Sequence, residues 1–95
     1  MLQHPLDNDE AKRLIAAVLK MGGAVGFSNH ALEEMEKDSL TTVDAVNVLR
    51  GGYVEFCEEK DRTWRYRVRT PRMTFVVAFR SEHELTVVTA WRKGR

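Results

Sequence analysis

Apolar residues recur at helical spacing through the first part of the chain. A good N-cap stands at Asp7 or Asn8. The apolar positions that follow fall at i, i+3, i+4, i+7 and i+8, and they are Ala11, Leu14, Ile15, Val18 and Leu19. Gly22-Gly23 supplies a left-handed stop after Lys20. The pattern predicts one helix with a single buried stripe.

Ser28 and Thr41 each predict the start of a shorter helix. Phe27 can pack on Leu32 across the first of these starts, and Asp44 can complete a capping box with Thr41. The side chains expected in the core are Ala31, Leu32 and Met35 from one helix and Val43, Val46 and Leu49 from the other. Gly51-Gly52 ends the last helix, and Gly22 and Gly51 are both expected at positive φ.

From Tyr53 onward the apolar period changes from 3.6 to 2, which predicts strands. The expected strands are Tyr53 to Glu58, Thr63 to Thr70, Met73 to Arg80 and Leu85 to Arg92. Their large apolar side chains, which helices must cover, are Trp64, Tyr66, Val68, Phe75, Val77, Phe79, Leu85 and Val87. The sequence therefore predicts a single α+β domain over residues 1–95. Two to three helices, at about 7–51, pack on one face of a four-stranded antiparallel sheet, at about 53–93.

The opposite face of the predicted sheet is lined with arginine. Its expected members are Arg65, Arg67, Arg69, Arg80 and Arg92, around a floor of Thr74, Val76, Ala78, Thr86, Val88 and Ala90. Arginine binds phosphate bidentately and stacks on bases, so this face is a candidate cradle for a polyanion or an acidic protein. The alternative is a solvated face partly paired with acids. Residues 61–95 contain three Asp/Glu and none on the arginine strand, which favours the binding site.

The charge of the chain is divided between its two halves. Residues 1–60 carry six Lys/Arg and eleven Asp/Glu, a formal net charge of minus five. Residues 61–95 carry nine Lys/Arg and three Asp/Glu, a formal net charge of plus six. A polyanion is expected on the basic half. The single cysteine, Cys57, excludes an internal disulfide and a four-cysteine zinc site. With no signal peptide or membrane-spanning run expected, the predicted location is cytoplasmic.

Several other polar residues have both a functional and a structural interpretation. His30 follows the Ser28 cap, where the helix dipole favours a neutral imidazole, so it is either a base or a residue that packs the helix. Trp91 is either core or a base-stacking platform. Ser28 and Asp44 are explained by capping, and Cys57 by strand packing. His4, expected in a frayed tail, and His83, in a turn, have no partner at metal-ligand spacing, so neither a metal nor a cofactor is expected.

Two resemblances bear on function. The run Phe27-Ser28-Asn29-His30-Ala31-Leu32-Glu33-Glu34-Met35, then Leu49-Arg50-Gly51-Gly52 and Val88-Thr89-Ala90-Trp91-Arg92, resembles an uncharacterised bacterial family marked by a Ser-x-His-Ala-x-Glu-x-Met box. The order of elements, Thr63-Trp64, Val68-Arg69-Thr70-Pro71-Arg72-Met73 and the basic end at Lys93 resemble the motility quorum-sensing regulator (MqsR) toxins. Both resemblances imply the RelE-like toxin fold, whose antiparallel sheet holds RNA.

The MqsR resemblance implies active residues that this chain carries in part. Those toxins use a lysine on the first strand, a glutamine on the second, a tyrosine on the third and a lysine near the C-terminus. Lys93 matches the last, while Arg65 lies near the glutamine position and Phe75 near the tyrosine position. The first strand has Glu55 and Glu58, with no lysine before Lys60.

The sequence therefore predicts a metal-independent endoribonuclease that acts as the toxin of a toxin–antitoxin pair. Its substrate would be messenger RNA, free or on the ribosome, and its partner an antitoxin protein. The expected catalytic residues are Arg65, Arg67, Arg80, Lys93 and His30, with Tyr66 as a weaker candidate for proton transfer. The expected RNA-binding residues are Arg69, Arg72, Arg92 and Trp91. The alternative is a non-catalytic RNA- or protein-binding module of the same fold, such as a topoisomerase-poisoning toxin.

Overall fold

Three capped helices form at the predicted starts. The structure is a computed structural model that describes residues 3–94, with the backbone alone for residues 56 and 57. The helices are α1 (Asn8–Lys20), α2 (Asn29–Lys37) and α3 (Thr42–Gly51). Their N-caps are Asp7, Ser28 and Thr41, and the capping box between Thr41 and Asp44 is confirmed. The packing predicted for Cys57 lies outside the described side chains.

Two apolar residues predicted to be buried in α2 and α3 are exposed. Val43 is 66% exposed, and the buried positions of α3 are Ala45, Val48 and Leu49. These three positions stand at i, i+3 and i+4, whereas the predicted set stands at i, i+3 and i+6, so the predicted line shares only Leu49 with the buried stripe. Leu32 of α2 is 46% exposed, whereas the predicted burial of Ala31 and Met35 is confirmed.

The sheet has one strand more than predicted. Its strands are β1 (Ala24–Phe27), β2 (Tyr53–Lys60), β3 (Thr63–Arg69), β4 (Met73–Ser81) and β5 (Glu84–Arg92), in the order β1-β5-β4-β3-β2. The α+β class is confirmed, and the purely antiparallel four-stranded sheet is wrong. β1 is parallel to β5, with Val25 opposite Leu85. A four-residue strand that contains glycine and pairs with a partner about 60 residues away carries no local pattern of its own.

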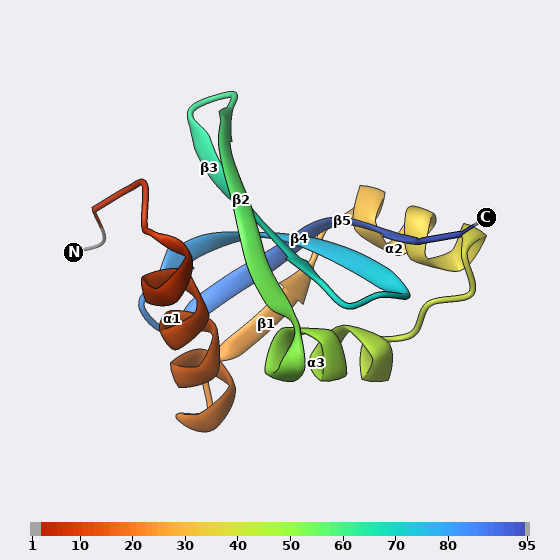
Figure 1. Ribbon diagram of the computed structural model, residues 1–95, viewed down its shortest axis with the longest axis horizontal. Coiled ribbons are helices and arrows are strands. Elements are labelled where there is room, and N and C mark those ends of the chain that lie inside the picture. Colours follow the sequence, from red (N-terminus) through yellow and green to blue (C-terminus); the bar gives the residue numbers. More distant parts are fainter. Residues whose placement is uncertain (1–2, 95) are drawn as a thin grey trace.

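All three helices lie on one face of the sheet. Their buried side chains share one core with the fully buried Tyr66, Val68, Phe75 and Val77 from β3 and β4. Figure 1 shows α1 and α3 side by side beneath the sheet, with α2 near the C-terminal end of β5. The β2–β3 hairpin extends beyond the sheet, because β3 pairs with β4 over Tyr66–Arg69 alone (Figure 1). No described helix packs on the opposite face, which carries Arg65, Arg67 and Arg69 and which we call the arginine face.

A β-bulge in β5 changes the side to which its last residues point. Val76 pairs with Thr89 whereas Val77 pairs with Val87, so Val88 is the extra residue. After the bulge, Ala90 is 1% exposed in the core, and Arg92 shares its face. The predicted positions of Ala90 and Arg92 on the arginine face are therefore wrong. Trp91 lies on the arginine face in their place, beside Thr74.

The segment before α1 is held against the core, so the prediction that His4 lies in a frayed tail is wrong. The Tyr66 hydroxyl lies 2.6 Å from His4 Nδ1 and accepts a hydrogen bond from the Leu6 backbone N–H at 2.9 Å. The Tyr66 ring is fully buried against Phe79. The buried phenol therefore finds its polar partners in this segment, and Tyr66 has no access to the arginine face.

Gly22 and Gly51, both predicted at helix ends with positive φ, differ in backbone conformation. Gly22 has φ +71°, as predicted for the end of α1. Gly51 lies within α3 and is not among the positive-φ glycines, so that prediction is wrong. The cap is Gly52, with φ −80° and ψ 172°, and α3 leads through it directly into the extended conformation of β2. Within residues 3–94, none of the helices is long and apolar enough to cross a membrane.

Candidate nucleic-acid interface

Three arginines of β3 form the centre of the uncovered face. Arg65, Arg67 and Arg69 alternate with Tyr66 and Val68, which are fully buried on the helix side. Cross-strand pairing places Arg67 beside Val76 and Arg69 beside Thr74 on β4. Trp91 of β5 completes the arginine face beside Thr74.

The small residues at the floor of the arginine face are buried by side chains of the sheet itself. Thr74 and Ala78 are 0% exposed and Val76 is 7% exposed, although no described helix reaches them. The arginines and Trp91 are themselves only partly buried. The side chains of the arginine face therefore lie across the small floor residues, and Arg65 Nε is itself buried. The open cradle with arginines at its rim, expected from the sequence, is replaced by a basic platform.

The Arg67 guanidinium lies over the indole ring of Trp91, with its carbon 5.2 Å from the ring centroid. A cation at this distance over a tryptophan face gains about 0.5–1 kcal/mol at an exposed site. Trp91 is therefore a surface residue of the arginine face and not part of the core. An indole next to a guanidinium gives a nucleotide a stacking surface beside a phosphate donor.

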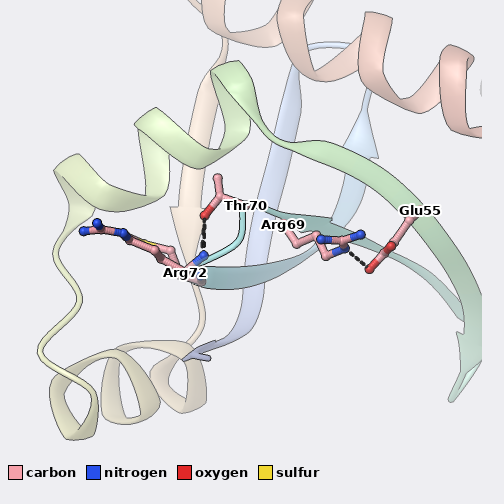
Figure 2. Close-up of polar contacts among 5 residues, drawn as sticks. Glu55, Arg69, Thr70 and Arg72 are labelled. Atoms are coloured by element: carbon pink, nitrogen blue, oxygen red, sulfur yellow. Dashed lines mark hydrogen bonds and ion pairs between the residues drawn. The ribbon is translucent and has the colours of Figure 1, made fainter. Parts of the chain in front are cut away.

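Glu55 brings a carboxylate to the arginine face. The register of β2 shifts between Val54 and Phe56, which leaves Glu55 as the extra residue opposite Val68 and Arg67. Glu55 forms an ion pair with Arg69 Nε, and Figure 2 shows the two side chains pointing toward one another. The hydrogen bond from Arg69 holds the pKa of the Glu55 carboxyl below its ordinary value, and the charges of Arg69, Lys93 and Arg67 act in the same direction.

The expectation that the arginines of β3 have no acidic partner is wrong for Arg69, which pairs with Glu55. The three acids of residues 61–95 do not include this partner, which comes from β2. One signal was available: Glu55 and Glu58 are three residues apart, and a regular strand turns such residues to opposite faces. Only a bulge lets both glutamates lie with the arginines, and Glu58 pairs with Arg65 in the observed register.

Arg80 and Lys93 lie at opposite ends of the β4–β5 hairpin, so they cannot converge on one phosphate. The Arg80 Nε donates to Thr86 Oγ1 at 3.1 Å near the turn, and the Lys93 backbone N–H donates to the Arg72 carbonyl at 2.8 Å at the open end. The strand between these ends spans about 23 Å at ~3.3 Å per residue. Lys93 lies near Glu55, whereas Arg80 is separated from that group.

Arg92 has a structural role on the helix side. Its Nε donates to the Asp38 carbonyl at 3.1 Å, its Nη2 donates to the Ser39 carbonyl at 3.2 Å, and its backbone N–H donates to the Asp38 carboxylate at 2.7 Å. These acceptors lie at the C-terminal end of α2, where a cation is favoured by the helix dipole. Ser39 has φ +57°, and the arginine holds this strained turn. The prediction that Arg92 lies among the RNA-binding arginines is therefore not supported by its position.

The two remaining candidates lie outside the arginine face. Arg72 is exposed in the β3–β4 turn, and Figure 2 shows its side chain pointing away from the Arg69–Glu55 pair. His30 is exposed in the first turn of α2, and its side chain forms no hydrogen bond or ring contact with any described residue. The structure therefore does not join His30 to the arginine strand.

Two buried polar atoms on the arginine face have no hydrogen-bond partner among the described residues. They are Arg65 Nε and Thr74 Oγ1. An unpaired buried donor costs about 1–3 kcal/mol. Among the side chains that the structure describes, no group of three His, Cys, Asp or Glu is arranged to hold a metal ion.

The geometry thus gathers Arg67, Arg69, Trp91, Glu55 and Lys93 at the open end of the β4–β5 hairpin, and it leaves Arg80, Arg92, Arg72 and His30 elsewhere. Neither a curated protein nor a solved structure matches the chain. Residues 27–92, well over half of the chain, match a domain family described as a domain of unknown function (DUF4258), and the protein therefore belongs to this family.

Proposed function

We propose that the protein is an RNA-cleaving toxin, a metal-independent endoribonuclease of a bacterial toxin–antitoxin pair with a RelE-like fold. The observation that carries the proposal is the sheet face that no described helix covers, where Arg67 and Arg69 flank Trp91 and the carboxylate of Glu55. Such a face supplies phosphate donors, a base-stacking ring and a proton acceptor within one group of side chains. The reaction takes place in the cytoplasm, on messenger RNA that is free or bound to the ribosome.

In the proposed reaction the RNA attacks itself. The 2′-oxygen bonds to the adjacent phosphorus, the bond to the 5′-oxygen breaks, and a 2′,3′-cyclic phosphate and a 5′-hydroxyl result. Arg67 and Arg69 stabilise the charge on the pentavalent phosphate. Glu55 accepts the proton of the 2′-hydroxyl, and the Lys93 ammonium supplies a proton to the leaving 5′-oxygen.

The ion pair with Arg69 makes free Glu55 a weak base, since the hydrogen bond holds its pKa below the ordinary value. A phosphate bound to Arg69 competes for the same guanidinium. When the phosphate takes that hydrogen bond, the pKa of Glu55 rises toward its ordinary value and the carboxylate becomes a better proton acceptor. Substrate binding therefore activates the base in this proposal.

Glu55→Gln is expected to separate binding from cleavage. The amide cannot accept the proton, so the cleavage rate should fall ~10²-fold or more. RNA binding should be as tight as in the parent or tighter, because Arg69 loses its competing carboxylate. Single-turnover rates and filter-binding affinities measure the two effects. The control is Glu59→Gln, on the other face of the same strand. An equal loss of cleavage rate in both variants would contradict the role of Glu55.

RNA binding is expected to weaken steeply with salt. Each phosphate contacted on a single strand contributes a slope of about −0.7 to the plot of log affinity against log salt concentration. Contacts from Arg67, Arg69 and Lys93 predict a total slope of about −2 in this estimate. Fluorescence anisotropy with a labelled oligonucleotide at several salt concentrations gives the slope. A salt-independent affinity would contradict phosphate binding.

The direct test of the proposed function is incubation of the purified protein with RNA of mixed sequence in excess chelator, followed by mapping of the ends. Products with a 2′,3′-cyclic phosphate and a 5′-hydroxyl support attack by the 2′-hydroxyl. The absence of cleavage, with RNA binding intact, would favour the second candidate, a non-catalytic RNA-binding module. The separation of Arg80 and His30 from the Glu55 group favours that candidate, since fewer catalytic groups converge than expected.

A further inference from the structure

We infer that the surface between the C-terminal halves of α1 and α3 binds an acidic amphipathic helix of a partner protein. A pocket of about 200 Å³ lies there, with Ala16, Leu19, Lys20 and Arg50 as its lining. Figure 1 shows the C-terminal end of α3 lying beside α1. This surface is formed by the helices and is independent of the arginine face and of RNA cleavage.

The floor of the pocket is apolar because of the periodicity of α1. Ala16 and Leu19 follow Lys12 at i+4 and i+7, so they lie on one side of the helix next to its buried stripe. Leu19 is partly buried and Ala16 is exposed. An alanine beside a partly buried leucine leaves a hollow that a larger side chain from outside can fill.

The rim of the pocket carries two positive charges without a counter-charge. The side chains of Lys20 and Arg50 form no hydrogen bond or ion pair with any residue that the structure describes. Neither has an acid three or four residues away in the sequence: those positions are Ala16, Ala17, Gly23 and Ala24 for Lys20, and Val46, Asn47, Tyr53 and Val54 for Arg50. In contrast, Lys37 on α2 pairs with Glu34 at 2.9 Å.

The two cations also have a local role, since each lies in the last turn of its helix, where the dipole favours positive charge. That role explains why a cation is present in each helix. The dipole does not explain why the two cations flank one apolar hollow, in a part of the chain (residues 1–60) whose formal net charge is minus five. Their shared position adds a binding function to the capping function.

The size and charge of the pocket identify the occupant. At about 200 Å³ the pocket is smaller than the ~300–1,000 Å³ typical of small-molecule sites, so it suits a single apolar side chain. An amphipathic helix presents residues at i and i+3 or i+4 on one face. A leucine flanked by glutamates at those spacings would place its side chain in the hollow and its carboxylates beside Lys20 and Arg50.

The test uses a synthetic helical peptide with one leucine, a glutamate four residues before it and a glutamate three residues after it. Backbone amide NMR of the full chain should show shifts at Ala16, Leu19, Lys20 and Arg50 on titration. Two matched peptides, one with both glutamates replaced by lysine and one with the leucine replaced by alanine, should each bind about tenfold more weakly or worse.

The charge requirement is tested by Lys20→Gln with Arg50→Gln, which should weaken peptide binding about tenfold. Lys60→Gln with Arg62→Gln removes the same charge at the β2–β3 turn and should leave binding unchanged. Ala16→Leu, which keeps every charge and a good helix former, should also weaken binding because it fills the hollow.

Two outcomes would overturn the inference. One is a peptide that binds elsewhere, for example at the arginine face, or not at all. The other is a short RNA that produces the same amide shifts around Leu19 and Arg50, which would show a polyanion site in place of a protein site. Neither outcome depends on whether the protein cleaves RNA.

Discussion

Arg67→Ala is expected to slow RNA cleavage by ~10²- to 10³-fold, the usual cost of removing one donor that stabilises charge in a transition state. Arg67 lies in the middle of the arginine strand, beside Val76 and over Trp91. Its guanidinium can therefore reach a phosphate while the base of the same nucleotide stacks on the indole. Single-turnover cleavage with a defined oligonucleotide measures the rate.

Folding should be little affected by the same substitution. The contact with Trp91 contributes about 0.5–1 kcal/mol, and Arg67 is only partly buried. Arg67→Lys keeps the charge but loses the bidentate fork, so its rate should fall between those of the parent and the alanine variant. Arg62→Ala, in the β2–β3 turn, is the control. Cleavage undiminished in Arg67→Ala would show that the arginine face does not hold the reacting phosphate.

Gly52→Ala is expected to destabilise the fold by about 3 kcal/mol, at the upper end of the usual cost of overpacking. A Cβ at this position would lie 2.7 Å from the Val48 carbonyl oxygen and 2.8 Å from the Arg69 carbonyl oxygen. Both are backbone atoms, one in α3 and one in β3, so neither can move without shifting its element. Lys12 Nζ also donates to the Gly52 carbonyl at 2.6 Å, which ties α1 to the same point.

The adjacent Gly51 provides the matched control. It lies in the last turn of α3, without positive φ, and a Cβ there has no heavy atom within 4 Å. Gly51→Ala should therefore be neutral or stabilise the protein by up to ~1 kcal/mol through helix propensity. Thermal unfolding should show a melting temperature lower by about 15 °C for Gly52→Ala and unchanged or higher for Gly51→Ala. Similar melting temperatures would contradict the close packing of α3 on β3.

Some residues of the candidate site could be predicted from the sequence. The alternation of Arg65, Arg67 and Arg69 with buried residues was evident, because a strand turns every second side chain to the same face. The membership of Glu55 was not evident. Trp91 was a candidate RNA-binding residue, but regular alternation along β5 would turn it to the helix side. Both residues reach the arginine face through bulges in β2 and β5. A bulge depends on how two strands are paired, and the composition of one strand does not reveal it.

The sequence by itself determined the local features of this protein. The three N-caps, the starts of the helices and the alternation along β3 depend on groups within a few residues of one another, so their patterns are complete within short segments. The tertiary structure alone decided the pairing of β1 with β5, the turn of Arg92 toward α2, the ion pair of Glu55 with Arg69 and the separation of Arg80 from Lys93. Each of these depends on the register between strands or on a helix packed far along the chain, and register is set by the burial of a whole face, which no short segment contains.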